Sequence, residues 1–215
     1  MNVVLVHGFL NRGGILRGLA QHLTSAGHTC FVPSLRPCDA RCGLPVLADQ
    51  LSRFISASLP DTSRFAIIGF SMGALVVRYY LQELGGYRRT DAFFSICGPH
   101  AGTLTAYMYP SVGVYQMRPR SEFLMRLDQS ADRLAGVPIT CYWTPFDLMV
   151  RPIESAKWLR AEHVRIPAPL HSIMVFDRRL YRDIEQRLFV IRPNQSLEPS
   201  AMTVTPPAGH EPRRP

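Results

Sequence analysis

One serine, Ser71, stands between two glycines in the run FAIIGFSMGALVV, which covers residues 65–77. The apolar residues before Ser71 are typical of a buried strand and those after it of a helix, so the pattern Gly-x-Ser-x-Gly predicts a sharp strand-to-helix turn. Side chains at Gly69 and Gly73 would collide with the neighbouring strand and helix, which accounts for both glycines. The turn places the Ser71 hydroxyl near a helix N-terminus, where negative charge is favoured. We predict that Ser71 is a nucleophile; the alternative is a glycine-rich turn with an idle serine.

A serine hydroxyl is a weak nucleophile unless a base takes its proton and an acid orients that base. After a turn of this kind, the acid precedes the base along the chain. His171, in PLHSIM, lies between the last predicted strand and the last predicted helix, which is where the base belongs. The other histidines after Ser71 lie too early in the chain or in the terminal tail: His100, His163 and His210. We predict His171 as the base; a surface-loop histidine is the alternative.

The acid is expected just after the strand that precedes the last one. Asp147, in TPFDLMVRP, is the aspartate that follows this strand directly. Glu154 could substitute for it, but it lies past Pro152, where an acidic residue is typical of a helix N-terminus. Asp128 and Asp132 fall on a predicted helix and are interpreted as surface charges. We therefore predict that Asp147 orients His171.

Acyl transfer also requires two N–H donors for the oxyanion that forms at the substrate carbonyl. The backbone N–H of Met72, directly after the nucleophile, is expected to be one of them. The second is predicted in the loop after the first strand, VVLVHGF, where His7 and Gly8 form a sharp turn that aims the N–H of Phe9. His7 itself is interpreted as a structural residue that ties down this loop.

Apolar residues near these groups are candidates for an acyl pocket, with ordinary packing as the alternative for each. They are Leu10, Tyr107, Met108 and Met149, together with Phe9 and Met72. Two of them belong to the segment 102–120, which is rich in Tyr and Met and does not fit a regular strand or helix. Long loops in compact domains are often functional, so this segment is predicted either to pack on the sheet edge or to form a wall or partial lid of the site.

Apolar strand-like runs alternate with helix-like segments along the chain, which predicts an α/β protein with a mostly parallel sheet of about six strands. The strands are nearly continuous in apolar residues, as expected when helices cover both faces of the sheet. Strands are predicted at 3–6, 29–32, 65–69, 92–97, 138–143 and 163–166, and helices at 12–25, 44–59, 72–84, 121–134, 154–159 and 176–189. Residues 191–215 are rich in Pro and are expected to form a disordered tail.

The stretches VVLVHGF, GFSMGA, CGPHAGT, QMRPRSEFLMRL, TPFDLMVRP and PLHSIM together resemble those of the α/β-hydrolases, in particular the lipases and esterases. The resemblance covers roughly residues 2 to 190, and residues 1–190 are therefore expected to be one catalytic domain. The first predicted strand is already the oxyanion strand, so the chain is expected to lack the two strands that usually come first in larger members and to carry no cap insertion, which is similar to the minimal lipases. The resemblance implies hydrolysis of carboxylic esters through an acyl-enzyme, a role in lipid metabolism and no cofactor.

Three other functions remain open at this stage. An acyltransferase would use the same acyl-enzyme with another acceptor in place of water. A thioesterase or amidase would use the same three residues on another carbonyl substrate. A hydrolase fold without activity would be a binding protein, which the complete set of Ser71, Asp147 and His171 argues against.

Composition limits the partners and the compartment. The net charge is +8, but the arginines that carry it are scattered, so nucleic-acid binding is not expected. Transient contact with an anionic membrane surface is compatible with this charge. No apolar run is long enough to span a membrane and no signal peptide is visible, which predicts a cytoplasmic protein, or a secreted one whose upstream signal was removed. Cys30, Cys97 and Cys141 are interpreted as core residues. Cys38 and Cys42 share the loop PCDARCG, where a metal site would need two further ligands and a local disulfide is the alternative to free thiols. The odd number of cysteines argues against a disulfide scaffold.

Overall fold

Six strands form a single sheet in which every neighbouring pair runs parallel. The computed structural model describes residues 1–191. Along the chain the strands are β1 (Asn2–Val6), β2 (Thr29–Phe31), β3 (Phe65–Phe70), β4 (Thr90–Ile96), β5 (Ile139–Trp143) and β6 (Glu162–Arg165), and their order in the sheet is β2-β1-β3-β4-β5-β6. The predicted α/β architecture is therefore confirmed. The predicted tail lies outside the described residues, apart from Ile191, which ends the last helix.

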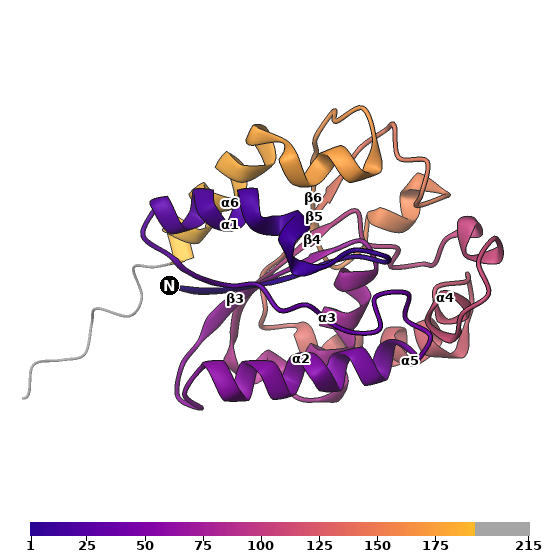
Figure 1. Cartoon of the computed structure of the whole chain (residues 1–215), viewed down its shortest axis with the longest axis horizontal. Helices are drawn as coiled ribbons and strands as arrows, with labels where there is room; N and C mark the ends of the chain where they lie inside the picture. The colour runs from indigo at the N-terminus through magenta and orange to yellow at the C-terminus, as the bar shows by residue number, and fades with distance from the viewer. Residues whose placement is uncertain (192–215) are drawn as a thin grey trace, which may run out of the picture.

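Helices cover both faces of this sheet (Figure 1). The α-helices are α1 (Arg17–Ser25), α2 (Leu44–Ser58), α3 (Met72–Glu83), α4 (Val112–Gln116), α5 (Glu122–Gln129) and α6 (Arg178–Ile191). The 3-10 helices are η1 (Gly13–Leu16), η2 (Gly86–Arg89), η3 (Leu104–Tyr107), η4 (Ala131–Leu134), η5 (Ile153–Ala156) and η6 (His171–Phe176). Helices α1 and α6 pack on one face, and α2, α3 and α5 on the other. None of the helices within residues 1–191 is long and apolar enough to cross a membrane.

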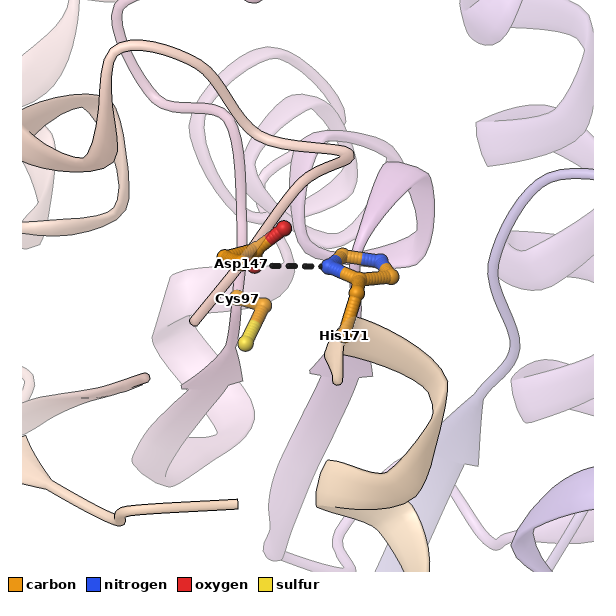
Figure 2. A group of neighbouring side chains, drawn as sticks. All are labelled: Cys97, Asp147 and His171. Carbon is orange, nitrogen blue, oxygen red and sulfur yellow. Dashed lines mark hydrogen bonds and ion pairs between the residues drawn. The ribbon is translucent and has the colours of Figure 1, made fainter. Parts of the chain in front are cut away.

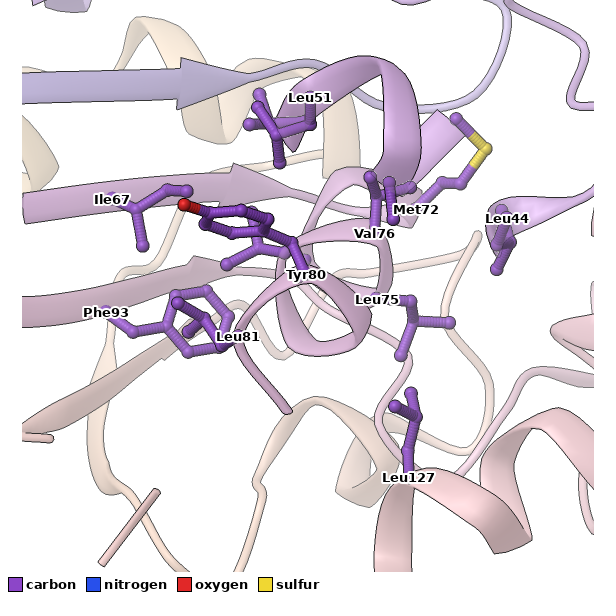
Figure 3. Close-up of a cluster of buried hydrophobic side chains, with 14 of the residues drawn as sticks. Leu44, Leu51, Ile67, Met72, Leu75, Val76, Tyr80, Leu81, Phe93 and Leu127 are labelled. Atoms are coloured by element: carbon purple, nitrogen blue, oxygen red, sulfur yellow. The ribbon is translucent and has the colours of Figure 1, made fainter. Parts of the chain in front are cut away.

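The sheet is buried because each face carries its own apolar cluster. Strand β3 is buried along its whole length, and side chains of α2, α3 and α5 interlock on one side of it (Figure 3). Leu51, Tyr80 and Phe93 lie in this cluster and come from α2, α3 and β4, which are distant in the sequence. Continuous apolar strands are what two covered faces require, since successive side chains point to opposite faces.

The structure differs from the sequence-based expectation in several connecting segments. The predicted helix at 154–159 is the short 3-10 helix η5, which begins directly after Pro152. Segment 102–120 contains η3 and α4, and α4 begins where the Ser111 hydroxyl accepts a hydrogen bond from the Val114 N–H. Within the described residues no helical cap domain interrupts the alternation of strands and helices.

One of the scattered arginines, Arg78, does not lie at the surface. Its side chain is fully buried on α3 beneath the loop that follows β4. The guanidinium pairs with Asp128 at 3.0 Å, donates to the His100 carbonyl at 3.3 Å and lies 4.0 Å above the Trp158 ring. Buried charges are retained when they are paired and hydrogen-bonded in this way. Arg78 thus holds three segments near the site together.

The strand order has a topological switch point between β1 and β3. From β1 the chain moves to β2 on one side, and it then returns to add β3 on the other side of β1. In open parallel sheets, ligands bind at the carboxyl ends of strands at such a switch point. The residues that follow β1 and β3, which include Gly8 and Ser71, therefore lie at the edge where a site is expected.

Candidate active site

Ser71 occupies a strained turn between β3 and α3. Its backbone has φ of 53° and ψ of −123°, a conformation that residues other than glycine rarely adopt. The turn is fixed because the Ser71 N–H donates to the Ile96 carbonyl at 2.8 Å. A Cβ at Gly69 would lie 2.6 Å from the Cα of Ala74, and one at Gly73 would lie 2.5 Å from the His7 carbonyl oxygen. Only glycine fits at both positions, for the steric reason expected from the sequence.

Asp147 and His171 are brought together from two different loops (Figure 2). His171 begins η6 after β6, and its Nδ1 lies 2.7 Å from Oδ2 of Asp147, which follows β5. The other carboxylate oxygen, Oδ1, accepts the N–H groups of Met149 and Val150, each at 2.8 Å. A carboxylate held by three donors can orient an imidazole with little freedom of its own.

The Asp147 carboxyl is 2% exposed, yet it is held in its ionised form. Burial raises the pKa of Asp147, but the hydrogen bond and charge of His171 and the two backbone N–H groups outweigh this effect. The pKa consequently lies below its usual value. An ionised carboxylate beside Nδ1 keeps a proton on that nitrogen, which leaves Nε2 of His171 as the acceptor for another proton.

His171 lies against the turn that carries Ser71. The ring of Phe70, the residue before Ser71, is 5.0 Å from the imidazole of His171, centroid to centroid. Among residues 1–191, no hydrogen bond joins the Ser71 hydroxyl to His171. In enzymes without substrate such bonds are often long or poorly aligned, and they tighten when substrate binds.

The loop after β1 passes directly beside Ser71. A Cβ at Gly8 would lie 3.1 Å from the Cβ of Ser71, so the two backbones are in close contact there. Within the described part of the chain, the backbone N–H groups of Phe9 and Met72 have no hydrogen-bond acceptor. Both therefore retain the donor capacity that an oxyanion requires.

His7 holds this loop in place through two hydrogen bonds to backbone groups. Its Nε2 accepts the N–H of Leu35 at 2.9 Å, and its Nδ1 lies 2.9 Å from the Gly8 carbonyl oxygen, to which it donates. Burial lowers the pKa of His7, although these two backbone contacts partly oppose it. A neutral ring with one donor and one acceptor satisfies both partners. This geometry agrees with a structural role for His7.

Of the six residues expected in an acyl pocket, Met72 is fully buried and Phe9 is half-buried. The other four are exposed rather than enclosed: Leu10, Tyr107, Met108 and Met149, with Met108 at 84%. Ordinary core packing therefore does not account for these four, whereas Met72 belongs to a core cluster. The four belong to a wider group of exposed apolar side chains in the loops after β1, β4, β5 and β6, here called the apolar rim. Its members are Leu10, Leu104, Tyr107, Met108, Tyr109, Val112, Tyr115, Phe146, Leu148, Met149, Leu170, Ile173 and Phe176.

Segment 102–120 connects the two loops on either side of the site. The hydroxyls of Thr103 and Thr105 both donate to the Met149 carbonyl, at 2.8 and 2.6 Å, and so brace the loop that carries Asp147. Further along, the ring of Tyr109 meets that of Phe9 edge-on at 5.1 Å. The segment thus contacts both the loop that carries Asp147 and the loop after β1. Its role as a wall or partial lid of the site stays a prediction.

The residues set aside in favour of His171 and Asp147 have other partners. His100 is buried, with its Nε2 2.8 Å from the Ser95 hydroxyl and its pKa held well below the usual value by burial. His163 lies 2.8 Å from the Trp158 carbonyl oxygen through Nε2. Asp132 pairs with Arg160, while Asp128 pairs with the buried Arg78. His210 lies outside the described residues.

Sequence reasoning missed one neighbour of this pair, Cys97, which it assigned to the core. The Cys97 sulfur, one nitrogen of His171 and one oxygen of Asp147 all lie within 4.8 Å of one another (Figure 2). Thiol, imidazole and carboxylate are a ligand set that Zn²⁺ accepts. Here, however, Nδ1 of His171 already donates to Asp147 at 2.7 Å, and within the described residues no hydrogen bond joins the Cys97 sulfur to either of them. The one signal in the sequence is position, because Cys97 directly follows a strand at the site edge. All five cysteines are free thiols.

Comparisons with known proteins agree with this architecture. A family model of the alpha/beta hydrolase fold matches residues 2–120. The structure of Aspergillus fumigatus lipase B superposes with a TM-score of 0.72 at 19% identity and covers 84% of this chain, which spans only 50% of that one. A Bacillus licheniformis lipase in its mature form gives a TM-score of 0.68 at 13% identity, with 87% of this chain and 91% of that one covered. A methylesterase from Arabidopsis gives a TM-score of 0.67 at 14% identity, with 88% of this chain and 99% of that one covered. No curated protein matches the chain.

Proposed function

Because the chain belongs to the α/β-hydrolase fold family, we propose that it is a serine hydrolase of carboxylic esters that acts through Ser71, His171 and Asp147. The observation that carries the proposal is the 2.7 Å hydrogen bond between His171 and Asp147 at the sheet edge where Ser71 occupies its strained turn. A nucleophile, a base and an acid that orients the base are the parts that acyl transfer needs.

The reaction would proceed in two stages. Oγ of Ser71 attacks the ester carbonyl carbon while Nε2 of His171 takes the hydroxyl proton, and Asp147 stabilises the imidazolium that forms. The N–H groups of Phe9 and Met72 bind the oxyanion of the tetrahedral intermediate. The bond to the leaving alcohol then breaks, and His171 returns the proton to that alcohol. Water releases the acyl group from Ser71 by the same steps, with His171 again as the base.

The apolar rim supports a substrate with an apolar acyl part. Exposed apolar side chains that gather at one edge mark a binding surface more often than scattered ones do. Two of the structures compared above are of lipases and one is of a methylesterase, and all three names denote hydrolysis of esters. We place Leu10, Tyr107, Met108 and Met149 along the path of the acyl chain. The predictions that concern nucleic acid, an anionic membrane surface and the compartment stay predictions.

Hydrolysis of p-nitrophenyl esters from acetate to palmitate tests this proposal. We expect the wild type to hydrolyse at least one of these esters, with an optimum acyl length that separates an esterase from a lipase. Ser71→Ala should lower the rate by roughly 10⁴-fold or more, because the nucleophile is then missing. Ser63→Ala, in the loop before β3, is the matched control and should keep the wild-type rate.

If no ester in the series is hydrolysed above the Ser71→Ala background, the ester-hydrolase proposal is wrong. A rate that rises only when an alcohol acceptor is added would instead identify an acyltransferase, and a preference for thioesters a thioesterase.

A further inference from the structure

Thr103, the last residue of the stretch CGPHAGT, lies where the loop after β4 meets the loop that follows Asp147. Its side chain is only 5% exposed, and its hydroxyl has two backbone partners in that second loop. The hydroxyl donates to the Met149 carbonyl at 2.8 Å and accepts the N–H of Arg151 at 2.9 Å. One hydroxyl thus spans a three-residue turn that begins two residues after the acid of the candidate active site.

The backbone on either side of Thr103 is bound to the same loop. The N–H of Leu104, the next residue, donates to the Arg151 carbonyl at 2.8 Å. The carbonyl of Gly102, the preceding residue, accepts a hydrogen bond from the buried Ser155 hydroxyl. Thr103 is therefore held in place by contacts other than that of its own side chain, which makes its hydroxyl a fixed point against which the loop is oriented.

The Met149 carbonyl belongs to the same peptide unit as the Val150 N–H, which donates to Oδ1 of Asp147 at 2.8 Å. This unit is trans and planar, so its C=O and N–H point in opposite directions, and a contact that fixes one of them aims the other. The carbonyl accepts two hydroxyls, that of Thr103 and, at 2.6 Å, that of Thr105. Both hydroxyls consequently set the direction of a donor to the carboxylate.

We propose that Thr103, assisted by Thr105, is a positioning residue of the candidate active site, whose hydroxyl aims the Val150 N–H at the Asp147 carboxylate. This inference rests on the proposed function. Thr103 holds both peptide units that flank Val150, one through its carbonyl and the other through its N–H. With Oδ1 of Asp147 fixed by the donor between them, Oδ2 keeps its direction toward Nδ1 of the imidazole.

Thr90 offers a matched control for a hydroxyl that only stabilises the fold. It is as buried as Thr103, at 2% exposed, and its hydroxyl also donates to a backbone carbonyl, that of Gly86, at 2.9 Å. It begins β4, at the opposite end of this strand from the candidate active site. Thr90→Val and Thr103→Val therefore make the same chemical change, and a general loss of stability would be common to both.

Thr103→Val keeps the shape of the side chain and removes the hydroxyl. We expect kcat for the best ester of the series to fall roughly 10-fold with little change in KM, as for the loss of a hydrogen bond. Thr103→Ser keeps the hydroxyl and should stay within about 2-fold of the wild-type kcat, as should Thr90→Val. Thermal unfolding followed by circular dichroism shows whether each variant is folded under the assay conditions. A kcat of Thr103→Val within 2-fold of that of Thr90→Val would overturn the inference.

Thr105→Val is a milder test of the same contact. Thr105 is half-buried, and the Met149 carbonyl keeps the Thr103 hydroxyl when the Thr105 hydroxyl is removed. We expect a smaller loss of kcat, roughly 4-fold, again with little change in KM. If Thr103→Val does not fold, an unchanged kcat in Thr105→Val overturns the inference in its place.

The Nδ1 proton of His171 makes the test independent of turnover, because its exchange with water requires the hydrogen bond to Asp147 to open. By NMR, this exchange should be roughly 10-fold faster in Thr103→Val and close to the wild-type rate in Thr103→Ser and Thr90→Val. If no protein of the set hydrolyses an ester but the exchange rates differ in this way, the positioning role stands and the proposed function is wrong. If the esters are hydrolysed and the exchange rates are equal, the function stands and the role assigned to Thr103 is wrong.

Discussion

Replacement of His171 by alanine is expected to lower kcat/KM for the best p-nitrophenyl ester by roughly 10⁴- to 10⁶-fold, because Ser71 then has no base. Asp147 cannot replace His171 as the base. It is 2% exposed, and its Oδ1 accepts the backbone N–H groups of Met149 and Val150. Initial rates measured with equal amounts of folded protein provide the comparison.

His163→Ala is the matched control for this substitution. His163 lies against the Trp158 carbonyl, away from the Asp147 carboxylate, so its loss should change kcat/KM by less than about 3-fold, as for most surface substitutions. If His171→Ala keeps more than a tenth of the wild-type activity while it is folded, His171 is not the base and the mechanism proposed above is wrong.

The second large effect is expected for Asp147→Asn, which should lower kcat by roughly 10³- to 10⁴-fold with a small change in KM. The amide keeps the shape of the carboxylate but carries no charge to stabilise the imidazolium. The backbone N–H groups of Met149 and Val150 hold the amide oxygen in the place of Oδ1, so the amide NH2 group faces Nδ1 of His171 and favours the wrong tautomer. Asp132→Asn is the matched control, since it makes the same chemical change at an exposed ion pair with Arg160. Activity of Asp147→Asn within 10-fold of the wild type would remove Asp147 from the mechanism.

The same substitution has an expected signature in stability against pH. Because the folded-state pKa of Asp147 is lowered, its ionised form stabilises the folded state at pH values above the unfolded pKa, which is about 3.9. This contribution is lost as the pH falls through the lower, folded-state pKa. Urea unfolding between pH 6 and about 3 should therefore show a smaller loss of unfolding free energy in Asp147→Asn than in the wild type. A parallel decline in both proteins would contradict the assigned pKa shift.

Most of the fold could be predicted because both faces of the sheet are covered. Short continuous apolar runs such as FAIIG, bounded by turn residues, are typical of strands buried on both faces. Each predicted strand matches an observed one within two residues. Prediction was weaker where tertiary contacts decide the local structure. Helix η5 and the helices of segment 102–120 are short, and their stability comes from packing and caps such as Ser111 rather than from a repeating apolar pattern.

The candidate site likewise has features that local sequence predicts and features that depend on tertiary contacts. The glycines around Ser71 have a steric cause that is local in the sequence, so the turn could be predicted from a few residues. The proximity of Cys97 to Asp147 and His171 depends on the register of β4 and β5, in which Ile96 lies opposite Tyr142. Neither this register nor the burial of Arg78 beneath the loop after β4 is visible from residue types alone.

The central claim is that Ser71 is an activated nucleophile, and reaction with a fluorophosphonate followed by peptide mass spectrometry tests it most directly. The probe forms a covalent bond to a serine oxygen only where a base takes the hydroxyl proton and the site stabilises the negative charge that develops. We predict one adduct, on the peptide that contains Ser71, and a rate of labelling that falls sharply in His171→Ala. Absence of an adduct on Ser71 in the folded wild type, or labelling that persists unchanged in Ser71→Ala, would contradict the account.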